Sequence, residues 1–118
     1  MENFDSGFWE ALDELVRTSD VVIDRPKGSA HPRYPNLLYP VDYGYLSGTR
    51  SMDGGGIDLW AGSGPKTIRA VLCTVDLLKR DSELKLLLGC TEEETAAILE
   101  RLRQTPCLNA LLIRREPL

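Results

Sequence analysis

The stretch YPVDYGYLSGTRSMDGGGID, residues Tyr39–Asp58, organises the rest of this chain. Its first part, Val41–Leu46, has the aromatic and β-branched side chains typical of a strand, and the glycine-rich run after it is typical of a hairpin turn. Asp53 and Asp58 flank the three glycines of that run. Two carboxylates separated by flexible backbone could also converge on a hard cation such as Mg2+, with nearby phenols holding phosphate oxygens. The residues alone leave both interpretations open, a plain hairpin turn and a metal-dependent phosphate site.

The segments on either side predict a small domain of mixed α and β structure. An amphipathic pattern predicts a helix at 4–17, with one face made of Phe8, Leu12, Leu15 and Val16. A capping box at Thr91 opens a second helix that ends at Arg103. Apolar and β-branched runs predict strands at 21–23, 41–46, 59–61, 67–78 and 83–88, and a last short strand or extended tail at 111–113. This order of elements favours an α+β fold built on a curled antiparallel sheet or small barrel.

Length and composition predict one domain covering residues 1–118. The chain is 42% hydrophobic and 27% charged, which excludes intrinsic disorder. Its net charge of −4 argues against nucleic-acid binding, because such proteins need a basic face to neutralise phosphates. The N-terminus is acidic where a secretory signal would be basic, and no apolar run is long enough to cross a membrane. We therefore expect a cytoplasmic protein without membrane contact.

The cysteine and histidine content limits which disulfides, metal sites and catalytic sites the chain can form. Cys73, Cys90 and Cys107 are far apart and form no CxxC pair, so neither a disulfide framework nor a zinc site is expected. His31 is the single histidine, and any Ser-His-Asp or Cys-His site would have to use it. It lies among prolines and polar residues, which favours a solvated loop residue over a catalytic one.

Three motifs, taken in order, resemble the soluble family I inorganic pyrophosphatases: VVIDRP at Val21–Pro26, YPVDYGY at Tyr39–Tyr45 and MDGGGID at Met52–Asp58. That family is similar in having a strand that ends in an acid and a proline, then YPxNYGY, then a DGDPxD metal motif. The resemblance implies an OB-like antiparallel β-barrel of about five strands with flanking helices. It also implies a requirement for Mg2+ and the hydrolysis of inorganic diphosphate, a small-molecule substrate, to two phosphates.

The resemblance implies roles for individual residues as well. The implied metal ligands are Asp53, Asp58, Asp81 and Glu83. The implied phosphate-binding residues are Arg33, Tyr39, Tyr43, Lys85 and Arg103. The candidates for catalysis are Tyr43, Asp42 and Asp24, and Asp24 stands where the family has a glutamate near the metals. Self-association into a homo-oligomer is also expected from the resemblance.

Two departures from the family pattern bear on catalysis. Gly55 replaces the middle acid of DGDPxD, which the family uses as the general base, and Pro35 replaces the glutamate of the family's KYE segment. Losing a general base typically costs about a hundred- to ten-thousand-fold in rate, unless Asp42 or Asp24 takes over that role. Three hypotheses follow: a Mg2+-dependent hydrolase, a homologue that binds a phosphate-containing ligand or protein partner without turnover, and a purely structural role for the acids.

Overall fold

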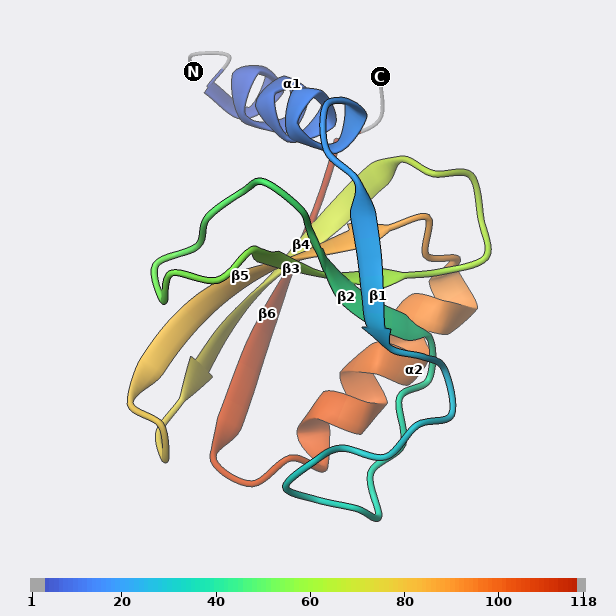
Figure 1. Cartoon of the computed structure of the whole chain (residues 1–118), viewed down its shortest axis with the longest axis vertical. Helices are drawn as coiled ribbons and strands as arrows, with labels where there is room; N and C mark the ends of the chain where they lie inside the picture. The colour runs from blue at the N-terminus through green and yellow to red at the C-terminus, as the bar shows by residue number, and fades with distance from the viewer. Residues whose placement is uncertain (1–3, 117–118) are drawn as a thin grey trace.

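The computed structural model describes residues 4–116 of the chain (Figure 1). The helices and strands follow the order α1 (Phe4–Arg17), β1 (Val21–Arg25), β2 (Asp42–Leu46), β3 (Ile57–Ala61), β4 (Ile68–Asp76), β5 (Asp81–Leu88), α2 (Glu92–Arg103) and β6 (Leu108–Arg114). Neither helix is long and apolar enough to span a membrane.

The six strands form one open sheet in the order β1-β2-β3-β5-β4-β6. Neighbouring strands are antiparallel except β3 and β5, which run parallel and pair Leu59 with Leu86. Within residues 4–116, β1 and β6 are the two edges of the sheet and do not pair with each other. The α+β class is therefore confirmed, whereas the closed, wholly antiparallel barrel of about five strands is not observed (Figure 1).

Each face of the sheet packs against one helix. Leu59 of β3 belongs to the same buried cluster as Trp9 and Leu12 of α1. Trp60, the next residue of β3, belongs to a second cluster with Ile98 of α2. Successive strand residues point to opposite faces, so these two clusters are the two sides of the sheet. α1 therefore packs on one face of the sheet and α2 on the other.

Both helices lie where the sequence predicts them, although α1 buries a different residue from the one expected. Phe8 is 44% exposed, and the larger indole of Trp9 takes the buried position. The capping box of α2 is confirmed, because the Thr91 side chain accepts the Glu94 amide and the Glu94 carboxylate accepts the Thr91 amide.

The second half of the sheet differs from the sequence prediction in its boundaries. β4 ends at Asp76 rather than Leu78, because the Asp76 carboxylate accepts the backbone amides of Leu78 and Lys79 and closes a turn there. The last segment is a full strand, β6, which pairs antiparallel with β4 along its length. It is not an extended tail.

The proline-rich segment 26–41 between β1 and β2, called here the β1–β2 arm, folds back on itself. Its backbone bonds run from the Gly28 amide to the Tyr39 carbonyl at 2.8 Å and from the His31 amide to the Leu37 carbonyl at 2.9 Å. An isolated bridge joins Ala30 and Leu38. These bonds fix the arm in place, and it lies beside α2 (Figure 1).

Candidate anion-binding site

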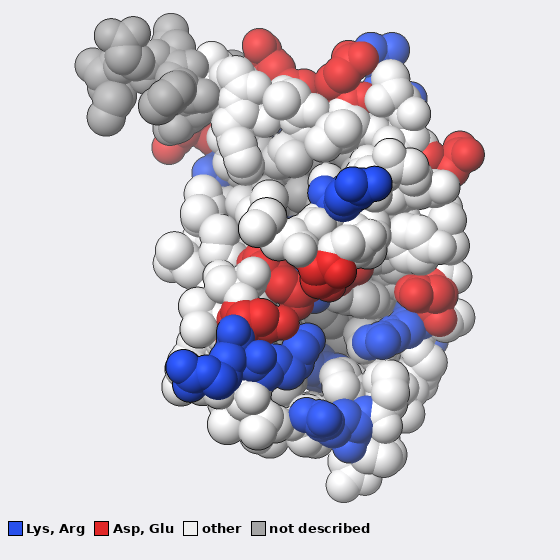
Figure 2. All heavy atoms as spheres, turned by 60° about the vertical axis from the view of Figure 1, so that its left-hand side comes forward, with Lys and Arg blue, Asp and Glu red and all other residues white. Residues whose placement is uncertain are grey.

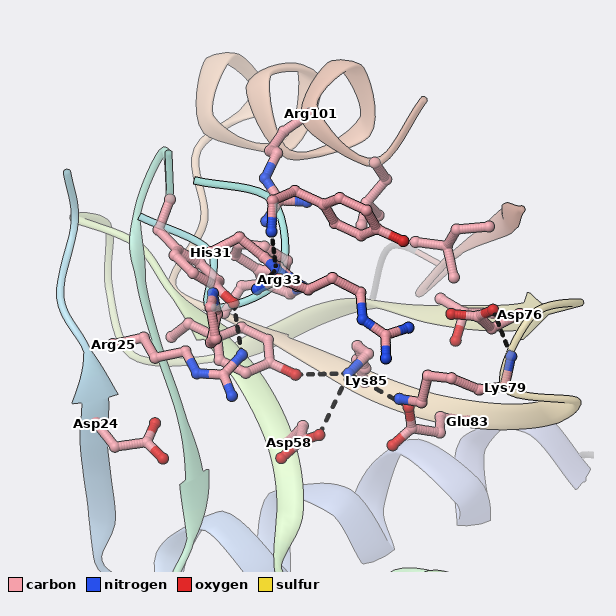
Figure 3. A pocket seen from close by; sticks show the side chains of 18 of the residues that line it. Asp24, Arg25, His31, Arg33, Asp58, Asp76, Lys79, Glu83, Lys85 and Arg101 are labelled. Atoms are coloured by element: carbon pink, nitrogen blue, oxygen red, sulfur yellow. Dashed lines mark hydrogen bonds and ion pairs between the residues drawn. The ribbon is translucent and has the colours of Figure 1, made fainter. Parts of the chain in front are cut away.

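A cavity of about 510 Å³ opens where the β1–β2 arm, the α2 face of the sheet and α2 meet (Figure 3). Its basic lining residues are Arg25, Arg33, Lys79, Lys85 and Arg101. Its acidic lining residues are Asp24, Asp53, Asp58, Asp76 and Glu83. Figure 2 shows basic side chains gathered next to acidic ones on one face of the molecule. The cavity therefore offers charged groups of both signs, and their pairing decides which ligand it can take.

The wall on the sheet side of the cavity is aromatic. Tyr39 and Tyr43 are 3% and 8% exposed, and both rings contact Trp60. Each phenol oxygen accepts a hydrogen bond from a basic side chain: Arg25 Nη1 donates to Tyr39 at 2.6 Å, and Lys85 Nζ donates to Tyr43 at 2.5 Å. Burial, with the nearby carboxylates of Asp58 and Glu83, raises the pKa of Tyr43 well above its usual value. The phenol therefore keeps its proton.

Lys85 is the centre of the acidic half of the cavity. Its Nζ lies 3.2 Å from Asp58 Oδ2 and 3.7 Å from Glu83 Oε1. Glu83 and Lys85 are alternate residues of β5 and so share one face of the strand. One ammonium serves two carboxylates here, which leaves the three groups together with a net charge of −1. Figure 3 shows Lys85 between Asp58 and Glu83.

Arg101 lies on the opposite side of the cavity, on α2, and is paired differently. Its side chain is only 7% exposed, and Nη1 donates to Thr105 Oγ1 at 2.8 Å. Its guanidinium carbon is 5.1 Å from the centre of the Tyr39 ring. Among residues 4–116 no carboxylate forms an ion pair with it, and its Nε has no hydrogen-bond partner within the chain. Burial lowers the pKa of Arg101 from its usual value.

A buried arginine without a carboxylate is costly, because desolvating a charge is unfavourable unless a counter-charge compensates it. Trp60 Nε1, in the same cavity wall, is a second buried donor that has no partner among the residues the structure describes. Arg25 and Arg33, which line the cavity near Arg101, also form no ion pair among the described residues. The arginine half of the cavity thus has donors and positive charge in excess. An anionic ligand would accept hydrogen bonds from these donors and balance the positive charge.

The residues implied as metal ligands do not form one cluster. Asp58 and Glu83 meet at Lys85, but Asp81 pairs with Lys79 at 3.6 Å and does not line the cavity. Asp53 lines it from the exposed loop after β2, where Ser51 Oγ and the Gly55 amide donate to its Oδ1. These two hydrogen bonds lower the pKa of Asp53.

No three His, Cys, Asp or Glu side chains among residues 4–116 are close enough to hold a metal ion together. One physical reason for this is that Gly55 has no side chain, so it adds no carboxylate between Asp53 and Asp58. Mg2+ is commonly held by one or two carboxylates together with substrate phosphates rather than by an all-protein cage. Asp58 and Glu83 therefore fit a cation that arrives with a phosphate ligand, and do not fit a cluster held by the protein alone.

Of the remaining predicted residues, the structure brings some into the cavity and leaves others outside. Asp24 and Arg33 line it. Asp42 lies outside, where its carboxylate accepts the Lys27 amide at 2.8 Å. Arg103 is also outside: it points to solvent on α2 and pairs with Glu100.

Sequence reasoning missed Arg101, Arg25 and His31. The signal for Arg101 was available, because it follows Ile98 by three positions and so shares the buried face of the helix, which Arg103 does not. Arg25 belongs to the VVIDRP motif, where it directly follows Asp24, the acid assigned to the site. His31 was expected to be solvated, and its place depends on the hydrogen bonds that fold the β1–β2 arm.

Comparison with protein families and with curated proteins gives no match to this sequence. Among solved structures, the inorganic pyrophosphatase of Helicobacter pylori is similar, with a TM-score of 0.57 and 16% identity over 80% of this chain and 81% of that one. The inorganic phosphatase of Anaplasma phagocytophilum is similar with a TM-score of 0.54 and 13% identity, again over 80% of this chain and 81% of that one. The resemblance seen in the sequence motifs is confirmed at the level of the fold: this chain has the fold of an inorganic pyrophosphatase.

Proposed function

We propose that this protein binds and hydrolyses inorganic diphosphate or a related small phosphoanhydride. The ligand would bind in the cavity between the β1–β2 arm, the sheet and α2. The observation that carries the proposal is Arg101, a buried guanidinium that faces the cavity without a carboxylate partner in the described chain. The fold shared with inorganic pyrophosphatases supports the choice of ligand.

The donors around Arg101 suit a phosphoanhydride better than a single carboxylate. Guanidinium groups bind phosphate oxygens through two parallel hydrogen bonds. Arg25, Arg33 and Arg101 come from β1, the arm and α2, so they approach the cavity from three directions (Figure 3). A ligand with several charged oxygens could use all three, and Lys85 together with the Tyr43 phenol could hold the far end. Diphosphate has the required number and spread of oxygens.

A divalent cation has a place in this proposal as a companion of the ligand. Asp58 and Glu83 are the residues that would hold it, sharing it with phosphate oxygens. When bound, such a cation neutralises phosphate charge and lowers the pKa of a coordinated water. Lys85, once relieved of its two carboxylates, would direct its ammonium group to the phosphate. We propose Mg2+ as this cation because its preference for few carboxylates and many phosphate oxygens matches this donor set.

The proton acceptor for hydrolysis is proposed to be Asp24. Gly55 cannot accept a proton, and Asp42 is occupied by the Lys27 amide outside the cavity. Asp24 lines the cavity, and the β1–β2 register shifts between Ile23 and Arg25 so that Asp24 is the extra residue. Such bulges redirect a side chain and recur next to active sites.

The experiment that tests this function is phosphate release from diphosphate with Mg2+, comparing the wild type with Asp58→Ala. We expect Asp58→Ala to lower the rate at least about a hundred-fold, because it removes one of the two carboxylates available to the cation. Glu100→Ala is the control, since it removes one carboxylate from the exposed face of α2, away from the cavity. Equal rates in the wild type and Asp58→Ala would contradict the proposal.

Binding without hydrolysis is the second candidate function. Gly55 at the general-base position favours it, and so does the lack of a three-acid group within residues 4–116. It predicts that diphosphate raises the melting temperature of the protein while no phosphate is released. The same phosphate-release assay, read beside a thermal melt, separates the two candidates.

A further inference from the structure

We infer that His31 is a ligand-binding residue of the cavity, which donates its Nε2–H to an oxygen of the bound phosphate. This inference rests on the function proposed above and adds a residue that neither the sequence motifs nor the fold likeness indicate.

The two nitrogens of His31 have different surroundings. Nδ1 accepts the backbone amides of Arg33 at 3.0 Å and Tyr34 at 3.2 Å. A nitrogen that accepts N–H bonds carries no proton, so the neutral ring holds its single proton on Nε2. The structure thus fixes the tautomer and the direction of the ring together. Nε2–H, on the far side of the ring from the arm's backbone, is the donor left for a ligand.

The ring itself is held in place by packing. It lies nearly parallel to Tyr39, at an interplanar angle of 8° and a centroid distance of 6.2 Å, and it contacts Tyr34 at 5.1 Å. His31 lines the same cavity as the unpaired Arg101. A donor whose orientation is already fixed loses little entropy when a ligand binds, which is how preorganised sites gain affinity.

The charges around His31 favour an anion over a metal ion as the ligand. Burial, followed by the positive charges of Arg101, Arg25, Arg33 and Lys79, lowers the pKa of His31. The ring is therefore neutral at neutral pH and adds a donor without adding to the mutual repulsion of the arginines. Those same charges would repel a cation at Nε2. An oxygen of a phosphate meets both the donor and the surrounding positive charge.

Two substitutions separate the donor role from the structural role of the ring. In His31→Asn the amide oxygen takes about the place of Nδ1, so the variant keeps the acceptor for the arm's backbone and loses the donor. In His31→Gln the amide nitrogen reaches about the place of Nε2, so this variant keeps a donor and weakens the backbone contacts. If His31 only stabilised the arm, His31→Gln would lose more diphosphate binding than His31→Asn.

The test is a calorimetric titration of wild type and both variants with diphosphate and Mg2+, together with their melting temperatures. We expect His31→Asn to weaken diphosphate binding roughly ten- to hundred-fold, the effect of one hydrogen bond to a charged group, with little change in melting temperature. We expect His31→Gln to melt lower and to bind within a few-fold of the wild type.

Unchanged binding in His31→Asn overturns the inference, and so does equal loss of binding in both folded variants, because that would indicate a structural role. If His31→Asn fails to fold, His31→Gln decides: retained binding supports the donor role and lost binding overturns it. A wild type that does not bind diphosphate contradicts the proposed function itself, so the two failures are distinguishable.

Discussion

Arg101→Met is expected to remove diphosphate binding while the protein stays folded. Removing one partner of a buried charge–charge contact typically costs about 2–5 kcal/mol of binding free energy, which is roughly a 30- to 5,000-fold loss of affinity. Methionine has a similar length and no charge, so it still fills the space beside Tyr39, while the hydrogen bond from the guanidinium to Thr105 is lost. Because the free protein no longer buries an uncompensated guanidinium, its stability should be unchanged or higher.

Arg103→Met is the matched control for this prediction. It removes the same side chain two positions along the same helix, where the guanidinium is exposed and pairs with Glu100. Calorimetric titration with diphosphate should give the wild-type affinity for Arg103→Met and a large loss for Arg101→Met. If both variants bind as the wild type does, or if Arg103→Met alone loses binding, the cavity is not where the ligand sits.

Gly44→Ala is expected to have the largest effect on stability of any single methyl group added to the sheet. Gly44 pairs with Ile23 where β1 crosses β2 closely. A Cβ at Gly44 would lie 1.8 Å from the Val22 carbonyl oxygen and under 3 Å from two further backbone atoms. Backbone atoms cannot turn aside as a side chain can, so β1 must separate from β2. Overpacking of this kind belongs to the mutations that cost about 4–5 kcal/mol or more, enough to unfold many small domains.

Gly7→Ala provides the comparison for Gly44→Ala. Gly7 lies in α1 with nothing within 4 Å of an added Cβ, and alanine favours a helix over glycine by up to about 1 kcal/mol. Urea unfolding should therefore show a slightly higher midpoint for Gly7→Ala and a much lower midpoint, or no folded baseline, for Gly44→Ala. A Gly44→Ala variant as stable as the wild type would mean that β1 is not held against β2 as described.

Local signals in the sequence were sufficient for the helices and for most of the strands. The capping box at Thr91 fixes the start of α2 through contacts within four residues, and the structure confirms both of its hydrogen bonds. Leu86, Leu87 and Leu88 alternate between the two buried faces, which explains why β5 ends in a continuous apolar run instead of an alternating one. Such patterns depend on neighbours in the chain and can be read from it.

The open sheet could not be predicted in the same way. It depends on the parallel pairing of β3 with β5 and on the antiparallel pairing of β4 with β6, which places β6 at the edge away from β1. Both are contacts between segments far apart in sequence. The sequence pattern of the strands is the same for an open sheet as for a closed barrel. A run of alternating residues states which side chains are buried, but not which element buries them.

The residues of the candidate site also differ in whether they could be predicted from the sequence. The family resemblance implied Asp58, Glu83, Lys85 and Tyr43 as site residues, and the structure brings these four together. Phosphate binding and catalysis by them remain proposals. The positions of Arg101 and Asp42 depended on helical phase and on the Lys27 amide, which motif order does not specify. His31 is informative only once the backbone bonds of the arm to its Nδ1 are known.

The central claim is that this cavity binds a phosphoanhydride, and calorimetric titration of the wild-type protein with diphosphate in the presence of Mg2+ tests it most directly. Saturable binding of one diphosphate per chain is the predicted result, since the unpaired guanidinium of Arg101 would then acquire its counter-charge. No binding at millimolar diphosphate, with or without Mg2+, would contradict the claim and leave the buried arginine without a ligand.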